Sequence, residues 1–358
     1  MSVVSPPLAG GGLVAFARDL AQRVVAEPLE FWLHEVAPTF SLSETLAEVV
    51  AVVDETPDIR TLVLAPNGRF RGHRAGQWVP VDVEIDGVRA RRCYSISSAP
   101  GGARLSITVK RVPRGRVSGF LHENAGVGAI LRLGEAQGEY VLPARVPARL
   151  LLVSGGSGAT PNMSILRDLV ARGAVADVVY LHYARTLADV PFAKELQGLA
   201  AVYPSLQVVL QLDDGPPRDL TELVPDFADR EAFLCGPTGL MDLLRRRWAE
   251  AGAIDRLHEE RFVAPTYARV DSGKTARITL SRARRTVAVT GAESLLEGLE
   301  RAGERPDHGC RIGICHTCRC RKRSGVVQDL VTGAISDAPD EEIRLCTSLA
   351  RSDLDLAL

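Results

Sequence analysis

Successive patterns of hydrophobic and polar positions divide the chain into regions. From about residue 46 to 147, short hydrophobic runs are separated by Gly, Pro and Asp, which is typical of the strands and turns of an antiparallel barrel or sandwich. We expect this region to form an antiparallel β-barrel. Its predicted strands are Val49–Val53, Thr61–Leu64, Trp78–Ile85, Arg92–Ile96 and Leu105–Val109.

Between about residues 148 and 263, hydrophobic runs of strand length alternate with helical segments. Because this alternation is typical of βαβ units, the region is predicted to be an α/β domain with a doubly wound parallel sheet. Helices are expected from about Pro161 and over Phe192–Leu199. The predicted strands are Arg149–Val153, Val178–His182, Leu206–Leu212 and Ala232–Leu234.

The two ends of the chain have patterns of their own. Residues 1–45 carry an apolar stripe at helical spacing, over residues 13–25, and are expected to be an N-terminal helical extension. We interpret that helix as packing on its own protein, and docking on a partner or a membrane surface is the alternative. Residues 264–274 are expected to be a linker. Residues 275–358 return to short strands around a group of cysteines.

Size and composition narrow the class of protein. A chain of 358 residues is longer than chains that usually fold around a single hydrophobic core, so two to four domains are expected. Its 43 Lys and Arg balance 44 Asp and Glu, which gives no argument for nucleic acid as a partner. No apolar run reaches the roughly 18 residues of a transmembrane span, and the first residues do not resemble a secretion signal. We therefore expect a cytoplasmic protein, and peripheral association with a membrane-bound partner stays open.

The cysteines carry the most specific signal. Cys310-x4-Cys315-x2-Cys318, with Cys346 after 27 intervening residues, is the spacing by which plant-type ferredoxins hold a 2Fe-2S cluster. Structural zinc is the competing interpretation, but zinc sites prefer paired Cys-x2-Cys arms. The four cysteines are therefore the predicted metal ligands, and Cys320 is predicted to be a free thiol.

A second motif lies in the predicted barrel, where Arg92-Cys-Tyr-Ser95 resembles the Arg-x-Tyr-Ser motif of the ferredoxin–NADP reductase superfamily. The resemblance implies that three side chains of one strand face a flavin: Arg92 on a phosphate, Tyr94 on the ring and the Ser95 hydroxyl near N5. The competing interpretation makes Tyr94 a core aromatic and Arg92 a surface charge. Downstream, a second motif opens a predicted helix that is expected to receive the pyrophosphate of FAD in preference to FMN. Its cofactor-binding residues are Gly115, Val117 and Ser118.

In the α/β region, a buried strand enters a glycine-rich turn and then a helix. Glycines there let the backbone approach a pyrophosphate, and the turn resembles the Gly-Gly-x-Gly-x-Thr-Pro turn of the same superfamily. The predicted nucleotide-binding residues are Gly155, Gly156, Gly158, Thr160 and Pro161.

Further along, Cys235-Gly236-Pro237 resembles the superfamily's Cys-Gly-Pro motif, which implies a thiol beside nicotinamide C4. Ser95 and Cys235 are therefore the expected catalytic residues, in the sense that they position the reacting rings. Phe262 is expected to shield one of these rings, with plain packing as the alternative. Arg185 follows the second strand, where it can pair with a 2'-phosphate, which favours NADPH slightly over NADH. A structural salt bridge and a contact with the adenosine are the alternatives for Arg185.

From about residue 46 onward the chain resembles the reductase components of bacterial oxygenases and fatty-acid desaturases, and residues 275–358 resemble an α+β, β-grasp ferredoxin domain. The resemblance implies an NAD(P)H:acceptor oxidoreductase that passes single electrons through FAD and 2Fe-2S to a diiron oxygenase, a hydroxylase or a membrane desaturase. A self-sufficient oxidoreductase and a redox-sensing binding protein are the alternatives. A basic rim is expected to favour an acidic docking face, and a merely solvated face is the alternative. The rim comprises Arg301, Arg305, Arg311, Arg319, Arg321, Lys322 and Arg323.

Overall fold

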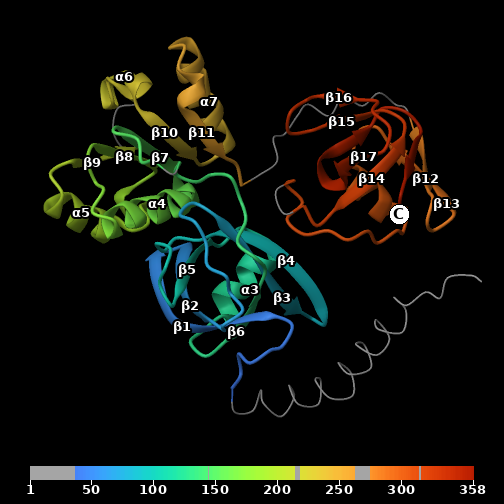
Figure 1. Ribbon diagram of the computed structural model, residues 1–358, viewed down its shortest axis with the longest axis horizontal. Coiled ribbons are helices and arrows are strands. Elements are labelled where there is room, and N and C mark those ends of the chain that lie inside the picture. Colours follow the sequence, from blue (N-terminus) through green and yellow to red (C-terminus); the bar gives the residue numbers. More distant parts are fainter. Residues whose placement is uncertain (1–36, 144, 214–217, 263–274, 314–315) are drawn as a thin grey trace, which may run out of the picture.

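The computed structural model describes residues 37–143, 145–213, 218–262, 275–313 and 316–358 (Figure 1). Three predictions fall outside these described residues: the helix over residues 13–25, the linker over 264–274, and the ligand role of Cys315. The domain boundaries set from the sequence also stay predictions.

The first described domain is the predicted antiparallel barrel. Its six-stranded sheet has the order β4-β3-β6-β1-β2-β5, and a bridge between Ile96 and Ile107 brings its two edges together. Alternate residues of the strands, such as Val49, Leu62 and Val79, fill the interior. The elements are β1 (Thr45–Thr56), β2 (Ile59–Pro66), β3 (Trp78–Ile85), β4 (Val88–Ser95), β5 (Leu105–Lys110), α3 (Arg116–Asn124) and β6 (Ile130–Leu133).

The second domain is the predicted doubly wound sheet, with all five strands parallel in the order β11-β10-β7-β8-β9. Buried side chains cover both faces: Met163 and Leu166 on one face, and Met241 and Trp248 on the other. The strand order reverses between β7 and β10, and ligands of open α/β sheets bind at such a reversal. The elements are β7 (Leu150–Gly155), α4 (Ala159–Ala171), β8 (Val178–Ala184), α5 (Ala193–Val202), β9 (Leu206–Leu212), α6 (Leu220–Leu223), β10 (Glu231–Cys235), α7 (Thr238–Glu250) and β11 (Leu257–Glu260).

The third domain packs one helix, α8 (Leu295–Arg301), on a five-stranded mixed sheet of order β13-β12-β19-β14-β17. Ser294 and Glu297 form a capping box that fixes the start of α8. A Cβ on Gly298 would lie 2.2 Å from Val289, so the helix can approach β13 only with glycine there. The strands are β12 (Thr275–Leu280), β13 (Arg285–Thr290), β14 (Arg319–Ser324), β15 (Val327–Asp329), β16 (Ile335–Ser336), β17 (Glu341–Arg344), β18 (Ser348–Ala350) and β19 (Leu354–Leu356).

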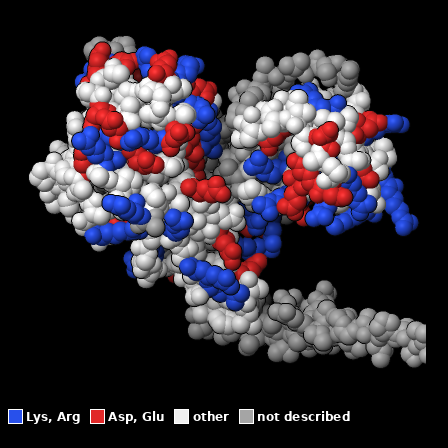
Figure 2. All heavy atoms as spheres, turned by 45° about the horizontal axis from the view of Figure 1, so that its top comes forward, with Lys and Arg blue, Asp and Glu red and all other residues white. Residues whose placement is uncertain are grey.

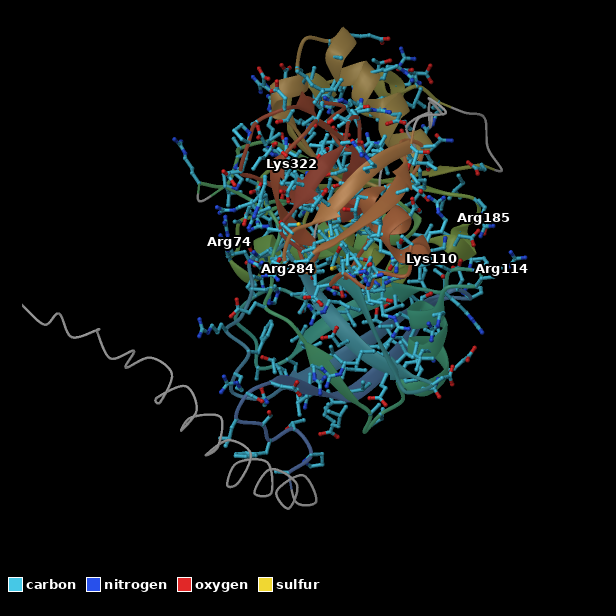
Figure 3. The ribbon with its side chains drawn as sticks, turned by 90° about the vertical axis from the view of Figure 1, so that its right-hand side faces the viewer. Arg74, Lys110, Arg114, Arg185, Arg284 and Lys322 are labelled. Atoms are coloured by element: carbon cyan, nitrogen blue, oxygen red, sulfur yellow. The ribbon has the colours of Figure 1, made fainter. Side chains whose placement is uncertain are left out.

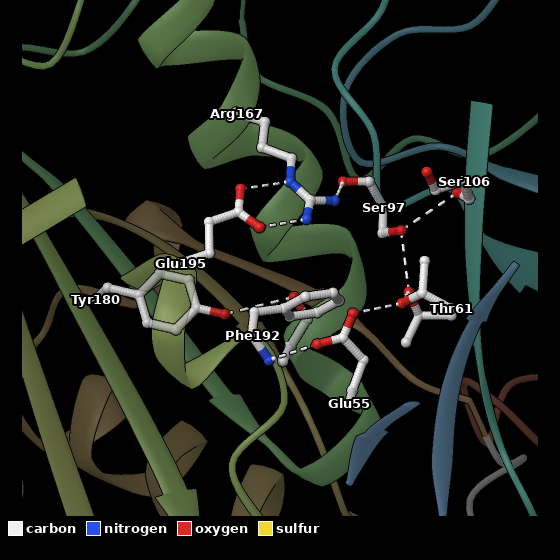
Figure 4. A network of polar contacts seen from close by, with 10 residues as sticks. Glu55, Thr61, Ser97, Ser106, Arg167, Tyr180, Phe192 and Glu195 are labelled. Carbon is white, nitrogen blue, oxygen red and sulfur yellow. Dashed lines mark hydrogen bonds and ion pairs between the residues drawn. The ribbon is translucent and has the colours of Figure 1, made fainter. Parts of the chain in front are cut away.

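A polar network joins the barrel to the α/β domain (Figure 4). The Arg167 guanidinium donates to both carboxylate oxygens of Glu195 at 2.8 and 2.6 Å, and to the carbonyl oxygen of Ser97 in the barrel at 2.7 Å. The backbone amide of Phe192 donates to Glu55 of β1 at 3.1 Å. These bonds hold the α/β domain against the segment that follows β4, so the end of β4 faces the ends of β7 and β10.

Candidate functional site

The glycine turn after β7 and the segment after β10 lie directly against each other. A Cβ on Gly158 would lie 2.1 Å from the carbonyl oxygen of Cys235, and a Cβ on Gly155 would lie 3.0 Å from Pro237. Gly156 has a φ of 54°, in the left-handed region that favours glycine. The structure therefore brings together both glycine motifs predicted from the sequence.

The first turn of α4 continues this turn. Thr160 and Pro161 are buried there, and the Thr160 hydroxyl donates to the carbonyl oxygen of Ser157 at 2.8 Å. A helix N-terminus that follows a glycine turn is a favourable site for phosphate. Lys110 of β5 also reaches this turn, because its Nζ would lie 3.7 Å from a Cβ on Gly156. Sequence analysis did not identify Lys110, since no local pattern links β5 to a turn in another domain.

Three polar side chains meet where β4, β10 and β11 end. Cys235 pairs with Glu260 in the parallel register of β10 and β11, and both side chains are buried. The Ser95 hydroxyl donates to Glu260 Oε2 at 3.4 Å across the domain boundary. Burial raises the pKa of Glu260 to about 8, so its carboxyl group is mostly protonated at pH 7. Burial, followed by the nearby Glu260, raises the pKa of the Cys235 thiol well above its usual value.

Sequence analysis gave Glu260 no role beyond ending the domain. The available signal was a carboxylate at the end of a strand of the α/β domain, two residues before Phe262. Phe262 itself is half-buried and packs against the core cluster that contains Cys235. Its contact with core side chains agrees with the packing alternative, and its shielding role stays a prediction.

The flavin motif is divided between two faces of β4. Tyr94 lies opposite Val79 and packs on the barrel core, whereas Ser95 lies opposite Trp78 and faces Glu260. Successive residues of a strand point to opposite sides, so Arg92 and Tyr94 lie on one side of β4 and Ser95 on the other, and their shared role at the flavin stays a prediction. Arg92 is exposed, and its Nη1 donates to the carbonyl oxygens of Arg91 at 2.7 Å and Gly309 at 3.3 Å.

The second flavin motif lies where predicted, at the start of α3. Gly115 precedes the helix, and a Cβ there would lie 2.5 Å from the Ser118 hydroxyl oxygen. Val117 is buried in the barrel core, so it anchors the helix and can offer only its backbone to a cofactor. Beside this turn is a surface hollow of about 820 Å³. Its lining includes the cations Arg111, Arg114 and Arg116, which suit a pyrophosphate.

The predicted discriminator of the nucleotide, Arg185, lies in the loop after β8 (Figure 3). Its side chain is 70% exposed, and its guanidinium pairs with Asp189 at 2.9 Å. A 2'-phosphate would therefore compete with Asp189 for Arg185. An exposed pair of this kind is weak, so the competition is possible at low cost.

The cysteine loop gathers buried thiols at one end of the third domain. Cys310, Cys318 and Cys346 are buried, and the sulfurs of Cys318 and Cys346 are 3.2 Å apart. The amide of Ile312 donates to Cys310 Sγ at 3.5 Å, as backbone amides around an iron–sulfur cluster do. The two adjacent buried thiols of Cys318 and Cys346, and a buried Cys310 with an amide directed at its sulfur, fit ligands of a 2Fe-2S cluster. Cys320 instead packs in the hydrophobic core of the domain.

The cysteine loop also contacts the barrel. Trp78 of β3 and Cys310 form a buried apolar contact, with Cys93 and Ile312 packed against it. The Arg92–Gly309 hydrogen bond described above borders this contact. The wall of the barrel that carries Ser95 therefore also carries the cysteine loop.

The predicted basic rim is only partly correct. Lys322 is fully buried, where it donates to the carbonyl oxygens of Gly325 at 3.0 Å and Ser336 at 3.2 Å and pairs with Glu341 at 3.1 Å. Its position on β14 points inward, because side chains alternate along a strand. Three other members of the rim, Arg301, Arg311 and Arg319, pair with Glu293, Glu300 and Glu342.

Together, the barrel with its phosphate turn, the glycine crevice of the α/β sheet and the cysteine loop define a flavin-dependent NAD(P)H reductase with its own 2Fe-2S domain. Three protein families match in this order: the oxidoreductase FAD-binding domain over residues 47–141, the oxidoreductase NAD-binding domain over 152–246, and the 2Fe-2S iron-sulfur cluster binding domain over 278–351. The chain belongs to the family of NAD(P)H oxidoreductases that transfer electrons through FAD and 2Fe-2S.

Relatives and solved structures agree with this assignment. An NADPH oxidoreductase of Mycobacterium tuberculosis is 38% identical over 346 residues, which cover 94% of this chain and 90% of that protein. The glycine betaine monooxygenase reductase subunit of Chromohalobacter salexigens is 32% identical over 339 residues, covering 85% and 92%. The structure of phthalate dioxygenase reductase superimposes with a TM-score of 0.64 at 25% identity, covering 88% of this chain and 98% of that one.

None of the helices in the described part of the chain has both the length and the apolar composition that a bilayer crossing requires.

Proposed function

We propose that this chain is the reductase component of an oxygenase and that it takes its electrons from NADPH. A nicotinamide delivers two electrons as hydride, FAD accepts the pair and releases the electrons singly, and a 2Fe-2S cluster carries one. The observation that carries the proposal is the shared barrel wall: Ser95 donates to Glu260, the register partner of Cys235, and Trp78, which lies opposite Ser95, contacts Cys310. A flavin on this wall would be adjacent to both the electron donor and the cluster.

The proposed roles follow from these positions. Gly155, Gly156, Gly158, Thr160 and Pro161 would bind the nucleotide pyrophosphate, with Lys110 as an added cation. Cys235, Gly236 and Pro237 would hold the nicotinamide against the flavin, and Ser95 would donate a hydrogen bond near flavin N5. Arg92, Tyr94, Gly115, Val117 and Ser118 would bind FAD, and Cys310, Cys315, Cys318 and Cys346 would hold the cluster.

The acceptor class is inferred from the relatives. Two of them are reductase parts of monooxygenases: the glycine betaine enzyme named above and the 3-ketosteroid-9-alpha-monooxygenase of Mycolicibacterium smegmatis, whose reductase is 34% identical over 322 residues. These names support an oxygenase as the acceptor. A membrane desaturase is the second prediction, since the cysteine loop resembles desaturase-associated reductases.

An absorption spectrum of the purified protein tests the proposed function. We expect flavin bands and a broad cluster shoulder, both bleached by NADPH, and reduction of cytochrome c by NADPH without any organic substrate. A preparation that contains no iron after anaerobic reconstitution, or one that does not reduce cytochrome c, would contradict it.

The nucleotide preference is tested at Arg185. Replacing it with Ala is expected to raise KM for NADPH by about tenfold, the effect of losing one exposed charge-assisted hydrogen bond, and to leave KM for NADH unchanged. The measurement is steady-state reduction of ferricyanide with each nucleotide. Arg246→Ala, a surface arginine of α7, is the control and should change neither value. Equal effects of Arg185→Ala on both nucleotides would refute the assignment to the 2'-phosphate.

A further inference from the structure

Unpaired arginines gather at the end of the third domain that carries the cysteine loop. We propose that this face, formed by Arg282, Arg284, Arg305 and Arg321 and named here the basic face, docks an acidic surface of the electron-accepting protein. The inference rests on the proposed function and adds the site and the charge of the partner.

Sheet topology places the basic face beside the cluster ligands. β19 lies between β12, which runs parallel to it, and β14, which runs antiparallel to it. The last residues of β12 and β19 and the first residues of β14 therefore lie at the same end of these three strands. The amide of Arg282 donates to the carbonyl oxygen of Leu358 at 2.7 Å, and the amide of Ala357 donates to that of Arg321 at 2.9 Å. The backbones of Arg282 and Arg321 therefore lie on either side of the last two residues of the sequence, Ala357 and Leu358.

The same edge holds two of the predicted ligands. Cys318 directly precedes β14, and its carbonyl oxygen accepts a hydrogen bond of 3.1 Å from the amide of Leu345, the residue before Cys346. Arg321 is three residues from Cys318 along the chain. The basic face thus lies close to the cluster site, a position from which an electron can leave to a docked partner.

The basic face and the barrel contact use different sides of the domain. Cys310 contacts Trp78 of the barrel, whereas the hairpin between β12 and β13, which carries Arg282 and Arg284, lies at the right-hand outer side of the third domain in Figure 1. An electron that enters at the Cys310 side can therefore leave at the basic face without displacing the barrel.

Most other arginines of the third domain have acidic partners, although Arg323 of β14 is exposed and has no ion pair among the described residues, like the arginines of the basic face. Arg277, Arg285 and Arg344 pair with Asp353, Glu304 and Asp329. Arg282, Arg284, Arg305 and Arg321 are exposed, and no salt bridge to them occurs among the described residues. In Figure 2, Lys and Arg side chains gather along the outer edge of this domain.

Four exposed guanidinium groups fit carboxylates, which they bind in a bidentate geometry. Attraction between these arginines and acidic residues of the partner would steer the two proteins together and make their association sensitive to salt. We favour an acidic protein over an anionic membrane because the acceptor of an electron must hold a redox centre close to the cluster. An anionic membrane is therefore treated as an outcome of the test.

The test reverses the charge of the face with the double variant Arg282→Glu, Arg321→Glu. The probes are cytochrome b5 as an acidic acceptor and cytochrome c as a basic one. At low ionic strength we expect kcat/KM for cytochrome b5 to fall by about tenfold and that for cytochrome c to rise. Both changes should shrink at about 0.5 M salt, where charges are screened.

A matched variant, Arg104→Glu, Arg246→Glu, makes the same charge change on the other two domains and should leave both acceptors unaffected. NADPH should bleach the cluster normally in both double variants. Loss of this bleaching would contradict the proposed reductase function and would not test the docking role of the basic face. An unchanged rate with cytochrome b5 would overturn the inference. The inference would also be overturned if kcat/KM for cytochrome b5 fell equally in both double variants. It would likewise be overturned if the only defect of the Arg282→Glu, Arg321→Glu variant were reduced binding to phosphatidylserine vesicles.

Discussion

Replacing Cys346 with Ser is expected to remove the cluster and to lower the reduction of cytochrome c by about a hundredfold, while NADPH still bleaches the flavin. Even changes to residues that only support metal ligands cost about 10 to 100-fold in metal affinity or activity, and loss of a thiolate ligand should cost at least as much. Cys346 is buried 3.2 Å from Cys318, so a serine oxygen would be left beside a sulfur ligand. The measurements are the absorption shoulder, the iron content and the rate with cytochrome c.

The neighbouring buried thiol provides the control. Cys320 lies two residues from Cys318 and packs in the domain core. Cys320→Ser should keep the iron and the shoulder, and should only reduce the free energy of unfolding by about 1–3 kcal/mol through a buried hydroxyl. Loss of iron in Cys320→Ser together with its retention in Cys346→Ser would contradict the ligand assignment.

The rate of flavin reduction is expected to depend on the protonation of Glu260. Because burial raises the pKa of Glu260 to about 8, its carboxyl group is neutral at pH 7 and ionises as the pH rises through 8. An ionised carboxylate would accept the Ser95 proton more strongly and turn that hydroxyl away from the flavin. The rate of flavin reduction by NADPH should therefore fall above pH 8. Glu260 is a positioning residue in this account, since it acts through Ser95.

Two variants separate the effect of charge from that of shape. Glu260→Gln is neutral at every pH, so its rate should be nearly independent of pH between about 6 and 10. Glu260→Ala should lower the rate by about 10²-fold at all pH values, in the range seen when one positioned donor or acceptor is lost. Stopped-flow absorbance of the flavin gives these rates. A wild-type profile that stays flat through pH 8, or a Gln variant that retains the fall, would reject the role of Glu260.

The same carboxyl group gives a stability readout that needs no substrate. Its folded-state pKa, about 8, lies above the ordinary value of 4.5, so between these values the folded protein keeps a proton that the unfolded chain has released. The contribution of Glu260 to the free energy of unfolding is therefore present below pH 4.5 and is lost as the pH rises through 8. Glu260→Gln should remove this fall, which denaturant unfolding at several pH values would detect.

The sequence by itself determined the elements and the motifs. Trp78–Ile85 and Leu206–Leu212 were predicted with the bounds that the structure has, because local hydrophobic runs and their bounding turns encode strands. The glycine turn at 155–158 was predicted because only glycine allows such close backbone approach. The cysteine spacing likewise encodes its chemistry within a few residues.

Tertiary structure decided which of these parts meet. Ser95 and Glu260 are 165 residues apart, and their contact arises only when the α/β domain docks on the barrel. Lys110 and Gly156, and Trp78 and Cys310, meet in the same way. The unpaired charges of the third domain could not be predicted either, because the sheet buries Lys322 and brings Glu342 to Arg319, while helix α8 brings Glu300 to Arg311. A local pattern specifies the conformation of its own segment, whereas burial, pKa and charge pairing depend on neighbours that the chain supplies from elsewhere.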